Sequence, residues 1–138
     1  MKCIAIDDEP MALEILSSFC QRYGNIELTT FNNPISGMDR VRKMKPDLLF
    51  LDIEMPGMNG IYVGNELKKA NKNVLIFVVT SYSEYLDEAM RFHVFRYLSK
   101  PIDRQRLFRN LKDALDLYHS TLLAAVMGIS NCTITMLL

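Results

Sequence analysis

Charged side chains follow three separate apolar runs in this chain. Asp7 and Asp8 come directly after the first run. Asp52 follows the second run, and Lys100 follows the third. Because open α/β sheets bind ligands at the carboxyl ends of their parallel strands, we expect these four side chains to lie close together. Three carboxylates and one ammonium in such a crevice predict a cation-dependent phosphate site.

A hard divalent cation is the expected occupant of the carboxylates. Asp7, Asp8 and Asp52 would repel one another, at roughly 4 kcal/mol per pair for a separation of about 4 Å and an effective dielectric of about 20. A divalent cation removes this cost, and an oxygen site with few carboxylates and remaining waters favours Mg²⁺. The same cation would neutralise an incoming phosphoryl group.

Asp52 is the expected nucleophile of this site. A carboxylate can accept a phosphoryl group and form an aspartyl phosphate. The phosphoryl oxygens then need donors, and the Thr80 hydroxyl and the Lys100 ammonium stand at the ends of two further strands. Phosphoryl transfer depends mostly on positioning and charge stabilisation, which such a site supplies.

Strand and helix patterns alternate five times along the chain. The expected strands are Lys2–Ile6, Ile26–Phe31, Asp47–Leu51, Val74–Val79 and Phe95–Leu98. The expected helices are Pro10–Tyr23, Asn33–Met44, Ile61–Ala70, Ser83–Phe92 and one that begins near Asp103. The segment Glu54–Gly60 is predicted to be a loop from its proline and glycine content.

This alternation predicts an α/β fold with helices on both faces of a five-stranded parallel sheet. The strand order 2-1-3-4-5 of flavodoxin-like folds places the topological switch point between the first and third strands. Asp7, Asp8 and Asp52 would then be neighbours.

Length and composition are those of one globular domain with a short remainder. The chain has 138 residues, and its 16 basic and 16 acidic side chains balance, so it lacks the basic footprint of a nucleic-acid-binding domain. The three cysteines have no metal-binding spacing, which indicates reduced thiols and a cytoplasmic protein. The amino terminus has no features of a secretion signal.

The carboxyl-terminal segment differs from the rest because residues 120–138 contain no charged side chain. Gly128 and Asn131 interrupt the apolar character, so a membrane span is not expected. Cys132–Met136 alternates as a strand does. We therefore divide the chain into a domain over residues 1–120 and, over 121–138, a linker with the truncated start of a second domain.

Four sequence blocks carry a family resemblance, and they occur in the order Ile6–Pro10, Leu51–Gly60, Val79–Ser81 and Tyr97–Pro101. Together they resemble the receiver domain of bacterial two-component response regulators, over about residues 1–120. The resemblance implies a phosphorylation-dependent signalling switch rather than a turnover enzyme, with limited Mg²⁺-dependent self-phosphorylation and self-dephosphorylation.

The resemblance also implies roles for single residues. Asp52 would accept the phosphoryl group from a sensor histidine kinase. Asp8 and Asp52 would ligate Mg²⁺ directly, together with the backbone carbonyl of Glu54, and Asp7 would act through water.

A second set of implied roles concerns switching. Thr80 and Tyr97 would form a pair in which the threonine hydroxyl moves to the phosphoryl group and the tyrosine ring turns inward. The face built from the fourth helix, the fifth strand and the fifth helix would then change and favour a homodimer. Glu54 and Tyr82 would tune the lifetime of the phosphate.

The sequences of Asp52–Pro56 and Tyr97–Ile102 further resemble those of regulators with a LytTR-type DNA-binding domain. The segment Thr133–Leu138 could be the first strand of such a domain. Such a protein would control transcription, and it would contact DNA only through the missing output domain. Arg96 departs from the family pattern, because an acid is frequent at this position.

Three alternatives remain open from the residues. A stand-alone receiver would act by binding a partner protein. An Mg²⁺-dependent hydrolase with an aspartyl intermediate would require an Asp-x-Asp motif after the first strand. The adjacent pair Asp7-Asp8 does not have this spacing. A degenerate receiver would signal without phosphate, and the intact site residues argue against it.

Overall fold

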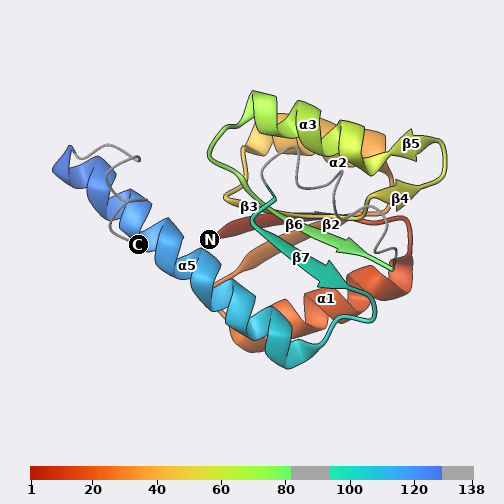
Figure 1. The fold of residues 1–138 in the computed structure, drawn as a ribbon, viewed down its shortest axis with the longest axis horizontal. Coiled ribbons are helices and arrows are strands. Elements are labelled where there is room, and N and C mark those ends of the chain that lie inside the picture. Colours follow the sequence, from red (N-terminus) through yellow and green to blue (C-terminus); the bar gives the residue numbers. More distant parts are fainter. Residues whose placement is uncertain (82–93, 129–138) are drawn as a thin grey trace.

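A five-stranded parallel sheet forms the centre of the molecule (Figure 1). The computed structural model describes residues 1–81 and 94–128. The sheet strands are β1 (Lys2–Ile6), β2 (Glu27–Phe31), β3 (Leu48–Leu51), β6 (Leu75–Thr80) and β7 (Arg96–Ser99). They lie in the order β2-β1-β3-β6-β7, and all four pairings are parallel. The predicted flavodoxin-like order is confirmed.

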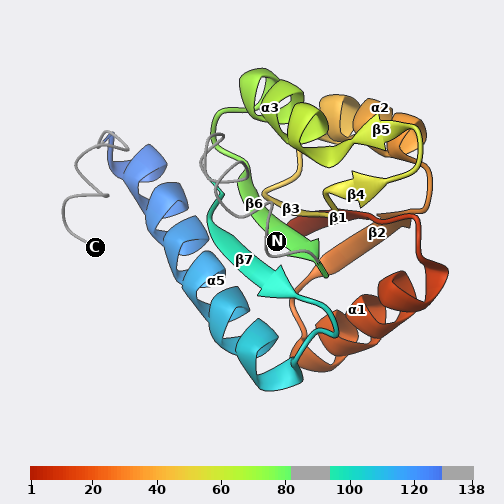
Figure 2. The same ribbon diagram turned by 45° about the vertical axis from the view of Figure 1, so that its right-hand side comes forward.

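Helices cover both faces of this sheet (Figures 1 and 2). The described helices are α1 (Pro10–Tyr23), α2 (Pro34–Met44), α3 (Gly60–Ala70) and α5 (Arg104–Met127). In both views α2 and α3 lie over one face, whereas α1 and α5 lie over the other. The predicted helix Ser83–Phe92 and the predicted strand Cys132–Met136 lie outside the described residues.

Two apolar layers result from the twofold alternation of side chains along each strand. Ile4 and Ile6 of β1 belong to the layer under α2 and α3. Cys3 and Ala5 point to the opposite layer, under α1 and α5. The central strand β3 is buried throughout, which is why its sequence is a continuous apolar run rather than an alternating one.

Polar residues start three of the helices. Asn33 accepts hydrogen bonds from the N–H groups of Ile35 (2.9 Å) and Ser36 (3.3 Å) at the start of α2. Asn59 caps α3 and Asp103 caps α5 in the same manner. These side chains satisfy backbone donors that a helix leaves open at its amino end.

The segment predicted as a loop contains a short hairpin of β4 (Glu54–Met55) and β5 (Met58–Asn59). The two strands pair antiparallel, and Gly57 takes a φ of 75° in the turn between them. Met55 is buried in the layer under α2 and α3. The loop prediction missed the hairpin because two-residue strands are too short to produce a periodic pattern.

Element boundaries otherwise differ from the predictions by one residue, as at β2, β3, β6 and β7. The larger difference is at α5, which continues past the predicted domain boundary at residue 120 and ends at Met127. Among residues 1–81 and 94–128, no helix has the length and apolar character needed to cross a membrane.

We expect the domain to remain folded when all residues after Tyr118 are deleted. Leu107, Leu111 and Ala114 anchor α5 to the sheet and are fully buried. Near the end of the helix only the small side chain of Ala124 is buried among the described residues, whereas Leu123 and Val126 are mostly exposed. The free energy of unfolding, measured in urea, should change by less than about 1 kcal/mol. Leu111→Ala is the positive control, with an expected loss of about 2–5 kcal/mol. A truncated chain without cooperative unfolding would contradict the prediction.

A carboxylate cluster at the carboxyl ends of the strands

Backbone hydrogen bonds fix the two aspartates that end neighbouring strands. The Asp52 N–H donates to the Ile6 carbonyl at 3.0 Å, which extends the pairing of β1 with β3 by one step. The Asp7 N–H donates to the Phe31 carbonyl at 3.1 Å on the other side of β1. Asp7 and Asp52 therefore lie side by side at the switch point of the sheet, as predicted.

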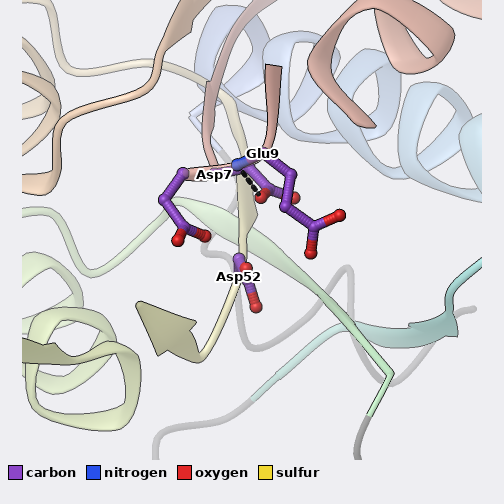
Figure 3. Close-up of side chains that lie close together, drawn as sticks. Asp7, Glu9 and Asp52 are labelled. Carbon is purple, nitrogen blue, oxygen red and sulfur yellow. Dashed lines mark hydrogen bonds between the residues drawn. The ribbon is translucent and has the colours of Figure 1, made fainter. Parts of the chain in front are cut away.

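Four carboxylates gather at this point. Asp7, Asp8, Glu9 and Asp52 each offer an oxygen, and these oxygens all lie within 4.8 Å of one another. The side chains of Asp7, Glu9 and Asp52 lie close together (Figure 3). Asp7 and Asp52 are buried, with 6% and 3% of their surfaces exposed, whereas the Glu9 side chain is mostly exposed. Buried carboxylates so close together require positive charge between them.

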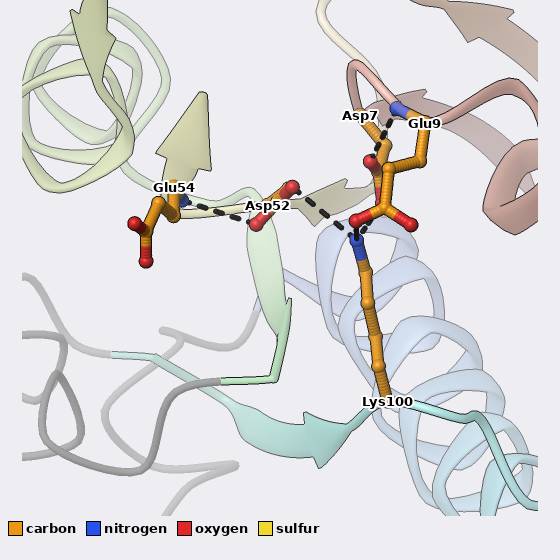
Figure 4. Close-up of polar contacts among 5 residues, drawn as sticks. All are labelled: Asp7, Glu9, Asp52, Glu54 and Lys100. Carbon is orange, nitrogen blue, oxygen red and sulfur yellow. Dashed lines mark hydrogen bonds and ion pairs between the residues drawn. The ribbon is translucent and has the colours of Figure 1, made fainter. Parts of the chain in front are cut away.

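Lys100 supplies that charge in this structure. Its side chain extends from the end of β7 into the cluster (Figure 4). The ammonium nitrogen lies 2.8 Å from Asp7 Oδ2, 3.1 Å from Glu9 Oε1 and 3.3 Å from Asp52 Oδ2. The Lys100 N–H donates to the Thr80 carbonyl at 3.0 Å, so β6 holds the backbone of the lysine in place. The Lys100–Pro101 peptide bond is cis.

Burial affects the pKa values of both Asp52 and Lys100. It raises the pKa of Asp52 to about 7; the Glu54 N–H and Lys100 lower this pKa in part, whereas the nearby charge of Asp7 raises it further. For Lys100, burial acts to lower the pKa, but the hydrogen bond to Asp7 and the negative charges of Asp52 and Asp7 raise it overall. The lysine therefore stays charged at neutral pH, while Asp52 without a further cation is close to its midpoint.

The two residues predicted as a switch pair lie on the same face of the sheet. Val78 is in register with Tyr97, and Thr80 is in register with Ser99. Because residues two apart along a strand share a face, Thr80 and Tyr97 both point to the layer under α2 and α3. Thr80 is buried, and Tyr97 packs against that layer while remaining partly exposed.

Glu54 contacts the cluster through its backbone. Its N–H donates to Asp52 Oδ1 at 3.1 Å (Figure 4), while its own side chain is exposed beside the site. Tyr82, which was predicted to tune phosphate lifetime, lies outside the described residues.

Two residues at the site were not predicted to belong to it. The sequence predicts no role in the site for Glu9, yet its carboxylate contacts Lys100. Gly60 was treated only as part of a loop, yet a Cβ there would meet the Ile53 Cα and lie 2.5 Å from the Asp52 carbonyl oxygen. The sequence did offer a signal for Glu9, because this residue is the third acid in a row after Asp7 and Asp8. No local pattern marks Gly60, because its constraint comes from a backbone seven residues earlier.

The donor set fits a hard divalent cation. All four clustered ligand atoms are carboxylate oxygens, two of them from buried side chains, and Mg²⁺ binds such oxygens. The described cysteines, Cys3 and Cys20, lie buried in the layer under α1 and α5 and are not part of the cluster.

Comparison with known proteins agrees with this geometry. The model of the response regulator receiver domain family matches residues 3–112. The transcriptional regulatory protein BtsR of Escherichia coli K12 is 38% identical over 112 residues, which cover 80% of this chain and 46% of BtsR. This chain thus spans about half the length of the curated relatives it matches.

Solved structures have the same fold. The response regulatory domain of mrkE from Klebsiella pneumoniae superposes with a TM-score of 0.80 at 24% identity, covering 86% of this chain and 98% of that domain. The REC domain of AraT, a response regulator from Geobacillus stearothermophilus, gives a TM-score of 0.77 at 28% identity and covers 87% and 97% of the two chains. By its family match, its fold and its site, this chain belongs to the receiver domain family of response regulators, which are signalling domains rather than typical enzymes.

Proposed function

We propose that this chain is a phosphorylation-dependent switch in which Asp52 accepts a phosphoryl group from a sensor histidine kinase. The observation that carries the proposal is the position of the Lys100 ammonium between Asp52 and Asp7 at the carboxyl ends of the strands. A buried carboxylate beside a fixed ammonium matches the needs of phosphoryl transfer, which are positioning and charge stabilisation.

In this proposal each side chain has one task. An oxygen of Asp52 attacks phosphorus, and the bond from phosphorus to the donor nitrogen breaks with its electron pair remaining on the donor. Lys100 offers an ammonium to the phosphoryl oxygens, and Thr80, at the end of the neighbouring strand, offers its hydroxyl. The Glu54 N–H keeps Asp52 oriented by its hydrogen bond to Oδ1.

The proposed cation is Mg²⁺, held by Asp8 and Asp52 with the backbone carbonyl of Glu54, and by Asp7 through water. When bound, Mg²⁺ supplies positive charge that offsets the carboxylates and the phosphoryl oxygens. Limited self-phosphorylation and self-dephosphorylation belong to the same proposal, as does tuning of phosphate lifetime by Glu54 and Tyr82.

Signal output would follow from Thr80 and Tyr97. Their shared face lets movement of the threonine hydroxyl toward the phosphoryl group open space for the tyrosine ring. The phosphoryl group must interact more favourably with the active conformation than with the inactive one, or the population of the two conformations does not shift. We propose that this change promotes a homodimer through the face formed by the predicted helix Ser83–Phe92, β7 and α5.

The output itself is proposed to be control of transcription in the cytoplasm. The match covers 46% of the transcriptional regulator BtsR, and this partial coverage supports the proposal of a separate output domain. We propose a LytTR-type domain for this role, which alone would contact DNA. Its first strand would lie in the segment Thr133–Leu138.

The direct test is phosphorylation by a small-molecule phosphodonor with Mg²⁺, read by intact mass. We expect the wild type to gain one phosphoryl group, and Asp52→Asn to gain none, because the amide removes the nucleophile. Asp39→Asn is the matched control, since its side chain is 62% exposed on α2, and it should behave as the wild type does. A folded wild type without mass gain, or equal gain in Asp52→Asn, would refute the proposal.

A further inference from the structure

Glu9 occupies an unusual position at the start of α1. It is the N-cap residue of this helix, but its side chain makes no capping hydrogen bond. Its backbone N–H donates to Asp7 Oδ1 at 2.9 Å, which fixes the residue beside the cluster. The carboxylate reaches the Lys100 ammonium instead, at 3.1 Å (Figure 4). A helix-start charge alone does not account for this contact.

The three partners of Lys100 differ in their exposure. The side chains of Asp7 and Asp52 are 8% and 4% exposed, whereas the Glu9 side chain is 60% exposed. An ammonium has three N–H donors, and the three carboxylates match that number. The lysine is thus shared between two inner carboxylates and one at the rim.

The inner partners are also residues that would hold a divalent cation. A cation bound to Asp52 directly and to Asp7 through water would repel the Lys100 ammonium at short range and compete with it for these two carboxylates. Lys100 must therefore withdraw from the inner carboxylates as the cation binds. It must nevertheless stay near Asp52, because the phosphoryl oxygens arrive there.

We propose that Glu9 is a positioning residue that holds Lys100 at the rim of the carboxylate cluster when a divalent cation occupies the inner carboxylates. The inference rests on the proposed function, because it assumes that this cation binds. Without Glu9, the ammonium would keep only Asp7 and Asp52 as partners among the described residues, and it would compete more strongly with the cation. Glu9 thereby affects both the affinity for the cation and the position from which Lys100 can bind the phosphoryl oxygens.

The first test is Mg²⁺ affinity by calorimetry for the wild type, Glu9→Gln and Glu14→Gln. Glu14 is an exposed acid on the same helix and controls for the loss of one negative charge. We expect Glu9→Gln to weaken binding about 2- to 5-fold, the range that one ion pair with an exposed carboxylate supplies. Glu14→Gln should remain within about 1.5-fold of the wild type. An affinity of Glu9→Gln equal to that of its control would overturn the inference.

A double-mutant cycle separates positioning from direct ligation. In a Lys100→Met background, the effect of Glu9→Gln should shrink to that of Glu14→Gln, because no ammonium is left to position. An effect of undiminished size would mean that Glu9 is itself a ligand, which would contradict a role through Lys100.

Nuclear magnetic resonance of the ammonium keeps the test decisive if Lys100→Met does not fold. With saturating Mg²⁺, the Lys100 ¹⁵Nζ signal should persist in the wild type and broaden through fast proton exchange in Glu9→Gln. Equal signals in the two proteins would refute the inference.

A wild type that binds no Mg²⁺ would refute the proposed cation site and this inference together. Normal binding without an effect of Glu9→Gln refutes only the inference.

Discussion

Gly60→Ala should destabilise the domain by about 3 kcal/mol, the upper end of the usual cost of overpacking. The added methyl group would collide with the Ile53 Cα and approach the Asp52 carbonyl oxygen to 2.5 Å. These are backbone atoms, so no side-chain rotation relieves the contact. The Gly60 N–H also donates to the Ile53 carbonyl at 3.0 Å, which ties the start of α3 to this backbone.

The measurement is urea unfolding followed by circular dichroism, with Gly57→Ala as the control. Gly57 has a φ of 75°, but no atom of residues 1–81 or 94–128 lies within 4 Å of the place that a Cβ would take, so only backbone strain of about 1 kcal/mol is expected there. The Mg²⁺ affinity of Gly60→Ala should also fall, because the collision displaces the backbone that carries Asp52. Equal stability of the two variants would show that the close approach is not a constraint.

Asp52→Asn should stabilise the cation-free domain at pH 8 by roughly 2–4 kcal/mol and should have little effect near pH 4. Burial raises the pKa of Asp52 from 3.8 to about 7 in the folded chain. Between these values the folded state holds a proton that the unfolded state has released, so stability falls as the pH rises from about 4 to about 7. Each pKa unit corresponds to 1.36 kcal/mol, which sets the upper end of the range.

The amide removes this titration and with it the cost of a buried negative charge. Stability curves in a chelator between pH 4 and pH 8 would therefore diverge for the wild type and Asp52→Asn. Mg²⁺ should narrow the gap by stabilising the wild type more than the variant, which lacks one of the proposed ligands. Asp39→Asn, which replaces an exposed carboxylate on α2, should run parallel to the wild type. A gap that does not depend on pH would contradict the burial argument.

Much of the fold could be predicted because its determinants are local. The continuous apolar run of β3 and the alternation of strands with helices specify a parallel sheet covered on both faces. The hairpin of β4 and β5 escaped prediction because its pairing involves only two residues on each side. The continuation of α5 to Met127 also escaped it, since an uncharged segment gives no polar face by which a helix could be recognised.

The sequence by itself determined which residues could do chemistry. Asp7, Asp8, Asp52 and Lys100 follow apolar runs, and strand order brings the ends of such runs together. Only the tertiary structure decided what each of them touches. Glu9 joins Lys100 across 91 positions of sequence, and Gly60 is required by a backbone that the chain folds against it. Contacts of this kind depend on distances between separate elements, and the periodicity within one element contains no information about them.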